Sequence, residues 1–407
     1  MKNFLPFLML HSSFIKVDSM ATNHGLWNRN FCLLVLANVF LFMSVYMLFP
    51  VLHGWIQAAL ECDGLHAALI TSVFGIAPFL SGPFNAYLVD RFKRKHVCVY
   101  SILLLSVITV FYGYVSDVRW MIAWLLLQGA MFGVALMSMG STLVIDVTPS
   151  RHRDGANACF TWAGLVGMLA GIVLGIEGGG PFVISSDGAF MLSACLALVS
   201  VVLVSAVRVC FRAPLDVPLL SFDRFLLFRT CLSGLNMMTV PVMLGFLLGT
   251  VGYGYTHFYL YMGAGFFVFL PVSRFITLKV GGRLLNGAGM LLMLAALGIL
   301  GFPDFGHRAF GCAGVLAGLG LGLSLYQFLR MMILLPLHCE RGTGYHTFQL
   351  LWGVGVTAGY LLCQWESRMS VGNPFVTAFV IGVAGLLFYQ LYVHRYYIRK
   401  LQDADII

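Results

Sequence analysis

The side chains best placed to do chemistry are polar groups inside long apolar runs. The residues that share this setting are Asn38, Tyr46, Gln128, Asn236, Gln327, Arg330, Gln349 and Trp352. A polar group buried in lipid without a partner is costly, so each must either hydrogen-bond to a neighbouring helix or face a polar cavity. Both readings stay open for each residue. Together the set predicts a mainly neutral cavity lined by amides and aromatic rings.

Formal charges are scarce in the middle of these runs. No Asp or Glu lies near the centre of any run, and Arg330 is the deepest charge. Arg330 lies within about two turns of the end of its run, so either its side chain reaches the membrane surface or it binds an anion or coupling ion. The sequence has no Gly-rich phosphate loop, no His cluster with metal-ligand spacing and no nucleophile elbow. We therefore predict no catalytic residue, no metal site and no cofactor.

The composition requires a lipid environment for these runs. Of the 407 residues, 60% are hydrophobic and only 10% are charged, which is too much apolar surface for a water-soluble chain of this length. Runs of about 20 apolar residues match the length of a membrane-spanning helix. The formal charge of +8 comes from Lys and Arg in short loops between the runs, which argues against nucleic acid as a partner. The ten cysteines are scattered and predict no disulfide framework.

The runs predict an all-α polytopic membrane protein with twelve transmembrane helices. We place them near 31–52, 66–88, 97–116, 120–144, 157–177, 188–208, 230–251, 254–275, 284–302, 309–335, 344–364 and 375–394. The expected parts are an N-terminal tail (1–27), a six-helix half (28–208), a central loop (209–229), a second six-helix half (230–395) and a C-terminal tail (396–407). Met20 is an alternative start, which would leave residues 1–19 upstream of the protein. The division between the seventh and eighth runs depends only on Gly252, Tyr253 and Gly254.

The distribution of Lys and Arg predicts the orientation. With both termini in the cytoplasm, the outside receives only Arg119, Arg308 and Arg368, Arg330 lies within a run, and all other basic residues are inside. This asymmetry follows the positive-inside rule and supports an even number of helices. We therefore expect an integral inner-membrane protein with both termini cytoplasmic.

An internal repeat supports the division into two halves. At a constant offset of 188 residues the matching pairs are Arg91 with Lys279, Lys95 with Arg283, Gly113 with Gly301, Arg153 with Arg341, Phe160 with Phe348, Gly167 with Gly355, Ala170 with Ala358 and Gly171 with Gly359. The pairs fall in equivalent loops and helices of the two halves, as expected of a duplicated six-helix unit with a site between its copies.

The segment 86–95 (AYLVDRFKRK) resembles a loop of the major facilitator superfamily, which carries the pattern G-x-L-a-D-R-x-G-R-K between helices 2 and 3. Asp90, Arg91, Arg94 and Lys95 match the pattern, whereas Ala86 and Lys93 replace its glycines. The resemblance implies that Asp90 contacts the start of the eleventh span and stabilises the conformer closed to the cytoplasm. The alternative is a positive-inside loop with one incidental acid.

A second segment, 146–153 (DVTPSRHR), resembles the D-x-x-P-x-x-x-R loop of the same superfamily. Asp146 and Arg153 match it, and Arg341 occupies the repeated position in the second half. The resemblance implies a gating role for these residues. A helix stop at Pro149 flanked by inside-positive charge is an equal alternative, and both can hold.

Residues 47–53 (MLFPVLH) resemble a segment of the twelve-helix drug exporters of this superfamily, with His53 in place of a proline. The resemblance implies a secondary transporter that works by alternating access and exports a small apolar or amphipathic molecule. Proton-coupled exporters carry an arginine where this chain has Leu125, and a Gly-Pro pair that its fifth span lacks. Uptake of a small metabolite by a symporter or facilitator is therefore the alternative, and a membrane-embedded enzyme or sensor is a more remote one. The expected partners are a small-molecule substrate and the lipid bilayer, with protons a candidate coupling ion, and the chain is expected to be a monomer.

Overall fold

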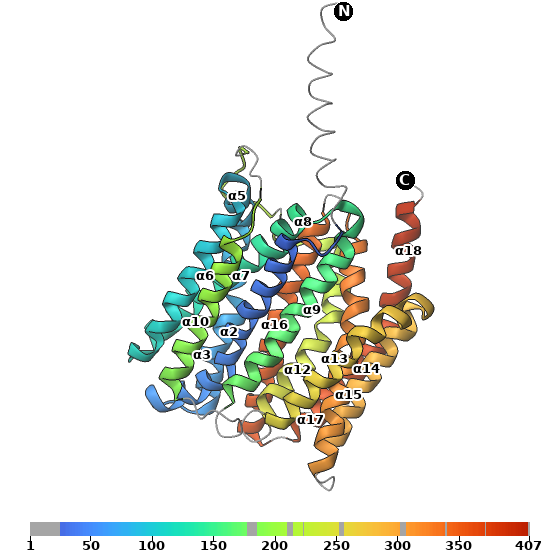
Figure 1. The fold of residues 1–407 in the computed structure, drawn as a ribbon. Helices are drawn as coiled ribbons and strands as arrows, with labels where there is room; N and C mark the ends of the chain where they lie inside the picture. The colour runs from blue at the N-terminus through green and yellow to red at the C-terminus, as the bar shows by residue number, and fades with distance from the viewer. Residues whose placement is uncertain are drawn as a thin grey trace, which may run out of the picture.

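A computed structural model describes residues 25–176, 185–209, 215–222, 224–251, 256–301, 307–337, 340–370 and 372–405. The question of a start at Met20 lies outside the described residues, as does most of the expected tail 1–27. The described chain is all-α, which confirms the predicted fold class. Figure 1 shows its long helices running side by side in a single bundle.

The first half contains six helical passes. They are α2 (Arg29–Ala59); α3 (Gly64–Ile76) with α4 (Pro78–Ser81), η1 (Gly82–Phe84) and α5 (Asn85–Arg91); α6 (Arg94–Val110) with η2 (Phe111–Tyr114); α7 (Val118–Leu136) with η3 (Met137–Leu143) and α8 (Val144–Val147); η4 (Ser150–His152) with α9 (Arg153–Gly175); and α10 (Ser186–Ser205). Asn28 begins α2 by accepting a hydrogen bond from the Phe31 amide, and Asp63 begins α3 in the same way with His66. Pro78 and Pro83 interrupt the second pass because proline cannot donate to the helical ladder.

The second half repeats the plan. Its passes are η5 (Phe228–Thr230) with α11 (Cys231–Met237) and α12 (Thr239–Thr250); α13 (Thr256–Lys279); α14 (Gly282–Gly301); α15 (His307–Leu334); α16 (Arg341–Met369); and α17 (Pro374–Phe388) with η6 (Tyr389–Val393) and α18 (His394–Asp405). Helical structure therefore continues to Asp405, past residue 395 where we expected the second half to end. The break at Met238 bends the first of these passes by 40°.

The expected twelve passes fit this arrangement. Within the described residues, nine helices are long and apolar enough to cross a bilayer, or ten when the bent pair α11–α12 counts as one span. The remaining passes are α13, whose shorter apolar part is His257–Ser273, and α16. Because α16 is packed against both halves, its polar residues meet protein rather than lipid, and it needs less apolar surface than the outer helices.

The division between the seventh and eighth passes is real, although residues 252–255 lie outside the described residues. The hydroxyl of Tyr259 on α13 donates a hydrogen bond of 3.0 Å to the carbonyl of Leu247 on α12. In one continuous helix, residues twelve apart would be separated by about 18 Å along the axis. The chain must therefore reverse direction between α12 and α13.

The repeated glycines allow close contact between the same pair of helices in both halves. A Cβ at Gly171 would lie 2.5 Å from the Met43 carbonyl oxygen, and one at Gly359 would lie 2.0 Å from the Val242 carbonyl oxygen. In each half, therefore, the fifth helix packs directly on the backbone of the first, α9 on α2 and α16 on α12. Only glycine permits such close contact between helices.

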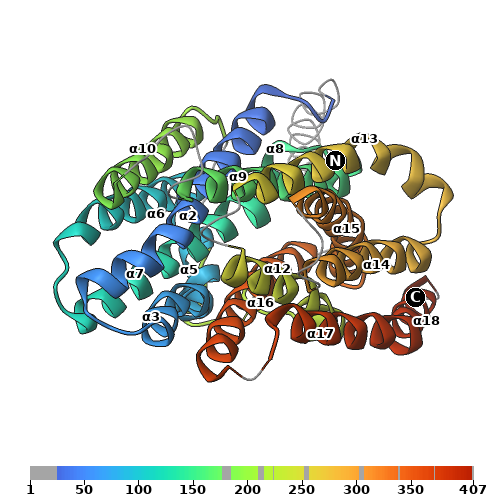
Figure 2. The ribbon, with the colours of Figure 1, turned by 90° about the horizontal axis from the view of Figure 1, so that it is seen from below.

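The two halves lie next to one another, and their basic loops share one end. Figure 2, which looks along the helices, shows α2–α10 on one side and α12–α18 on the other. In Figure 1, α5, α8 and α18 all reach the upper end of the bundle. We call this the basic end, because the residues that meet there include Arg91, Arg94, Arg224 and Arg341. Its cytoplasmic location is the sequence prediction.

Candidate functional site

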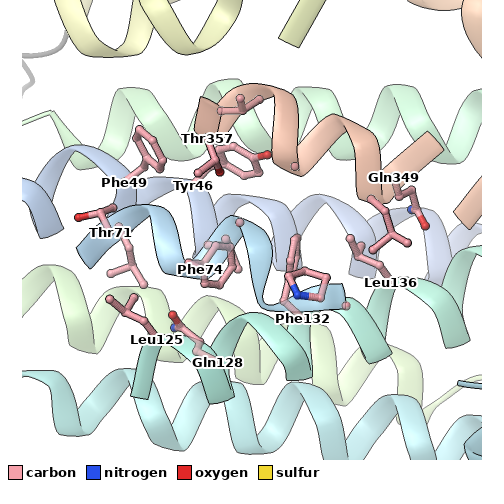
Figure 3. Close-up of a pocket in the computed structure, with 18 of the residues that line it drawn as sticks. Tyr46, Phe49, Thr71, Phe74, Leu125, Gln128, Phe132, Leu136, Gln349 and Thr357 are labelled. Carbon is pink, nitrogen blue, oxygen red and sulfur yellow. The ribbon is translucent and has the colours of Figure 1, made fainter. Parts of the chain in front are cut away.

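A cavity lies between the first half and α16 of the second half. Its wall in the first half comes from α2, α3 and α7, and includes the rings of Tyr46, Phe49, Phe74 and Phe132. From α16 come His346, Gln349, Leu350, Gly353, Val356 and Thr357. Figure 3 shows Gln349 and Thr357 on one helix facing the side chains of the first half across this space. The described lining contains no Asp, Glu, Lys or Arg.

The cavity is narrow in this conformer. Its volume is about 60 Å³. A water needs about 10–15 Å³ by this measure, so there is room for a handful of waters.

Three of the eight predicted cavity residues line this space, namely Tyr46, Gln128 and Gln349. Trp352 lies beside the Tyr46 hydroxyl from the α16 side. The amide of Gln128 is already used, because it accepts a hydrogen bond from Tyr112 and donates one of 2.7 Å to Thr109. Gln128 therefore ties α7 to α6 and η2, and presents only part of its surface to the cavity.

The other four predicted cavity residues lie elsewhere. Asn38 donates to the Phe160 carbonyl at 2.8 Å, and Asn236 donates to the Gly385 carbonyl at 2.9 Å, so both join helices within one half. Gln327 is buried in the second half against Gly282. Arg330 is exposed on the surface of α15.

Charged residues predicted to form a gate meet at the basic end. Arg94 donates to both carboxylate oxygens of Asp146, at 2.8 and 2.9 Å, and lies 3.5 Å from Asp90. Lys95 donates to the carbonyls of Ser205 and Val207, both at 3.2 Å. These contacts hold the ends of α5, α6, α8 and α10 together within the first half.

The partner of Asp90 differs from the one that the sequence led us to expect. Its carboxylate accepts a hydrogen bond of 3.1 Å from Nε of Arg224 in the central segment, and not from the start of the eleventh span, α16. Arg91 pairs with Asp216 of the same segment at 3.0 Å. Arg341, at the start of α16, pairs instead with Asp154 of α9 at 3.7 Å. Arg153 begins α9, and its Nε has no hydrogen-bond partner among the described groups.

The central segment itself lies against the first half. We call residues 215–222 and 224–227 the strap. The Leu215 amide donates to the Asp90 carbonyl at 3.1 Å, and the Ser221 amide donates to the Pro83 carbonyl at 2.9 Å. The Phe225 ring packs on Gly82, where a Cβ would lie 2.0 Å from the ring. The Leu227 amide then donates to Thr347 of α16 at 2.9 Å, so the strap touches both halves.

Sequence reasoning missed the strap and one further contact between the halves. Asn85 of α5 and Nε2 of His346 on α16 are 3.1 Å apart, although the two residues are 261 positions apart in the chain. The hydroxyls of Thr161 and Tyr345 also meet across the halves, at 3.1 Å. A histidine inside a predicted span was the available signal for His346, and two phenylalanines in a polar loop, Phe222 and Phe225, were the signal for the strap.

The two halves also touch at the end opposite the basic end. Arg368 at the end of α16 forms an ion pair with Asp63 in the loop after α2. The rings of Phe49 and Tyr360 meet edge to face with their centroids 4.7 Å apart. The halves therefore touch at both ends in this conformer. Among the described residues, no group of three or more His, Cys, Asp or Glu side chains is arranged to hold a metal ion.

The family model described as Major Facilitator Superfamily matches residues 34–360. The chain belongs to the Major Facilitator Superfamily. The family fold agrees with two crystal structures of transporters. The nucleoside transporter NupG is 13% identical with a TM-score of 0.63, and the match covers 92% of this chain and 100% of that one. The human organic anion transporter MFSD10 (TETRAN) is 14% identical with a TM-score of 0.66, and the match covers 89% and 99%.

A curated relative resembles a shorter part of the chain. Multidrug resistance protein 2 of Bacillus subtilis (strain 168) is 22% identical over 140 residues, which cover 34% of this chain and 34% of that protein. The chain thus spans about a third of the length of this relative. Membership of the superfamily makes the chain an integral membrane protein and places it in a family of transporters.

Proposed function

We propose that this superfamily member is a secondary active transporter that exports a small, uncharged apolar or amphipathic molecule by alternating access. The observation that carries the proposal is the cavity between the halves, which has four aromatic rings and no formal charge in its described lining. Aromatic and aliphatic walls favour an apolar body, because they bury its surface without asking for a specific hydrogen bond. An ion would lose its water there without gaining a counter-charge.

Alternating access requires that the contacts between the halves break at one end of the cavity while those at the other end remain. At the end opposite the basic end, the candidates are the Arg368–Asp63 ion pair and the Phe49–Tyr360 contact. At the basic end, the candidates are the Asn85–His346 contact and the Arg341–Asp154 pair. Both sets join the halves through α16, so this helix is the proposed moving part of both gates.

The motif residues gain a defined role in this scheme. Asp90, Arg94 and Asp146 form the ionic cluster that fixes the basic end of the first half, and Arg224 attaches the strap to it. Since the strap also bonds to Thr347 of α16, it links the cluster to the helix that must move. We propose that Asp90 stabilises the conformer closed at the basic end through Arg224.

Uptake is the second candidate function. The apolar side chain of Leu125 lines the cavity. Proton-coupled drug exporters of the superfamily carry an arginine at this position. A facilitator or symporter for a small metabolite needs no such arginine.

The test is solute flux through the purified full chain in liposomes. Nile red, a neutral amphipathic dye, and ethidium, a cation, serve as probes beside a panel of radiolabelled neutral metabolites, each with and without a proton uncoupler. We expect saturable movement of Nile red, little movement of ethidium, and recovery of the dye without chemical change. Ethidium flux that exceeds Nile red flux would overturn the preference for uncharged molecules. Concentrative entry of a metabolite without Nile red flux would favour uptake.

A further inference from the structure

The last helical pass changes character before it ends. α17, η6 and α18 follow one another without a break from Pro374 to Asp405. Up to Val393 the exposed side chains of this pass are mainly apolar, and from Arg395 onward they are mainly basic. Among the spans that the structure describes, this pass is the least buried inside the protein, so it offers lipid a large face. Figure 2 shows α17 and α18 at the outer edge of the second half.

Basic side chains from three helices gather around α18. We call them the α18 basic surface; they are Arg283 of α14, Arg330 of α15, and Arg395, Arg399 and Lys400 of α18, and all five are exposed. Arg283 lies beside His394, and Arg330 lies beside Tyr397. The acids of α18, Asp403 and Asp405, are confined to its last turn. The part of α18 next to the bundle is therefore strongly positive.

Arg283 is held in a fixed position within this surface. Its Nε donates a hydrogen bond of 2.8 Å to Oε1 of Gln390, and its Nη2 donates one of 2.9 Å to the Gln390 carbonyl. The side chain of Gln390 donates back to the Arg283 carbonyl at 3.2 Å. A guanidinium group has five N–H donors, and these contacts use two of them. Arg283 thus joins α14 to the start of α18 and keeps donors for a further acceptor.

The arginines of the α18 basic surface differ from those at the basic end of the first half. In the first half Arg91, Arg94 and Arg224 all pair with carboxylates. Among the side chains that the structure describes, no carboxylate forms an ion pair with any of the four arginines of the α18 basic surface. Clusters of cations next to a membrane-spanning helix attract anionic lipid headgroups.

We propose that the α18 basic surface, together with the exposed apolar face of α17 and η6, binds an anionic phospholipid. The lipid phosphate accepts hydrogen bonds from Arg283 and from the cations of α18. The acyl chains lie on Leu387, Phe388 and Leu391, which are 54%, 41% and 63% exposed. Tyr392 is 55% exposed between the two parts of the site, at the depth where aromatic rings meet lipid headgroups.

The apolar part of the site favours a lipid over a free anion. A soluble phosphate would use only the cations, whereas a phospholipid also covers the apolar side chains that lie directly before them in the chain. The site lies outside the described lining of the cavity, so the proposal does not depend on the proposed substrate.

The charges set the size of the expected effect. Each Lys or Arg near an anionic headgroup contributes about fivefold in affinity. Removal of three such cations should therefore weaken binding by at least about tenfold, even where the separate contributions add incompletely. Added salt screens these exposed charges, so high salt should also weaken binding.

The experiment measures lipid binding to the purified full chain by native mass spectrometry. The probes are palmitoyl-oleoyl phosphatidylglycerol, which is anionic, and phosphatidylcholine with the same acyl chains, which has no net charge. We expect the parent to bind its first phosphatidylglycerol at least about tenfold more tightly than its first phosphatidylcholine. In the triple variant Arg395→Gln, Arg399→Gln, Lys400→Gln, the affinity for phosphatidylglycerol should fall at least about tenfold and the affinity for phosphatidylcholine should stay the same.

A second triple variant controls for the total charge of the protein. Arg29→Gln, Lys93→Gln, Arg151→Gln removes three exposed cations from the basic end of the first half, and should bind phosphatidylglycerol like the parent. An equal loss of affinity in this control, or no loss in the α18 variant, would overturn the proposal. So would a parent that binds the two lipids equally.

Two further measurements separate the lipid site from other causes. The variant Arg395→Lys, Arg399→Lys keeps the charges and should keep the preference for phosphatidylglycerol; loss of the preference there would mean that the arginines support the fold of α18 and would reject the charge-based site. The soluble headgroup analogue sn-glycerol 3-phosphate, added at the concentration of the lipid, should not displace it, because the analogue has no acyl chains. Full displacement would reject a lipid as the occupant.

Discussion

At the scale of single residues, a polar side chain inside a membrane helix is informative only once its partner is known. The eight polar residues that stand out in the sequence divide in the structure. Tyr46, Gln128 and Gln349 line the cavity, whereas Asn38 and Asn236 join helices within a half. Gln128 and Gln349 carry the same side-chain amide group as Asn38 and Asn236, so position relative to neighbouring helices, and not chemistry, makes the difference. His346 does not belong to the predicted set, yet it joins the halves directly.

Asp90 is the residue whose replacement should affect the gate most. Asp90→Asn weakens charge-assisted hydrogen bonds to Arg94 and Arg224, so we expect transport of Nile red to fall about tenfold while the amount of protein in the membrane persists. Asp216→Asn is the matched control, because Asp216 pairs with Arg91 but its side chain is fully exposed. Dye flux normalised to protein in proteoliposomes measures both. Full activity of Asp90→Asn would remove the gating role.

At the scale of elements, glycine contacts and the strap are the features that set how helices meet. Glycines of α9 and α16 let these helices pack on the backbones of α2 and α12. These contacts lie within a half, and they favour halves that move as units. The strap, by contrast, contacts both halves, through Asp90 and Pro83 on one side and Thr347 on the other.

The close contact between Gly171 of α9 and the backbone of α2 predicts that adding a single methyl group at Gly171 lowers the stability of the protein. In Gly171→Ala the new Cβ would lie 2.5 Å from the Met43 carbonyl oxygen, so α9 must move away from α2. Overpacking of this kind costs roughly 1–3 kcal/mol. We expect the thermal midpoint of the detergent-solubilised protein to fall by several degrees, about 2–4 °C per kcal/mol for a large domain. Gly298→Ala, which meets nothing within 4 Å, is the control and should leave the midpoint unchanged or raise it.

The packing of Phe225 should determine how tightly the strap is bound to the first half. Its ring is 7% exposed and lies against Gly82 and Phe79, so Phe225→Ala removes the main apolar contact of the strap. We expect trypsin to cut after Arg224 at least about tenfold faster, because cleavage follows the population of the released strap. Leu220→Ala, a change at a side chain that is 60% exposed, should leave the rate of that cut as it is. An unchanged rate in Phe225→Ala would mean that the polar contacts alone hold the strap.

At the scale of the whole molecule, the two halves touch at both ends of a narrow cavity. The halves meet at the basic end through α16 against α5, η3 and α9, and at the other end through the Arg368–Asp63 pair. A transporter must break these two sets in turn. Weakening one set should therefore shift the population toward the conformer open at that end.

We expect Arg368→Gln to shift the population toward the conformer open at the end opposite the basic end. Thr71 lines the cavity and is buried, so a cysteine introduced there by Thr71→Cys reacts with a membrane-impermeant maleimide only when the cavity is open. We expect labelling through that end to rise about fivefold when Arg368→Gln removes the ion pair, which corresponds to about 1 kcal/mol. Arg119→Gln changes an exposed cation at the same end and should have no effect. The parent chain without Thr71→Cys corrects for native cysteines.

The sequence by itself determined that the chain crosses a membrane, that its helices form two related halves, and which end carries the basic loops. These properties follow from local quantities, namely the length of apolar runs, the charges between them and a constant repeat offset. The tertiary structure decided which polar groups face one another. Asp90 meets Arg224 across 134 positions, and Asn85 meets His346 across 261. Such pairs depend on how helices are rotated and packed against each other, and no local pattern encodes that geometry. Local pattern therefore specified the elements, and packing between elements specified the cavity and its gates.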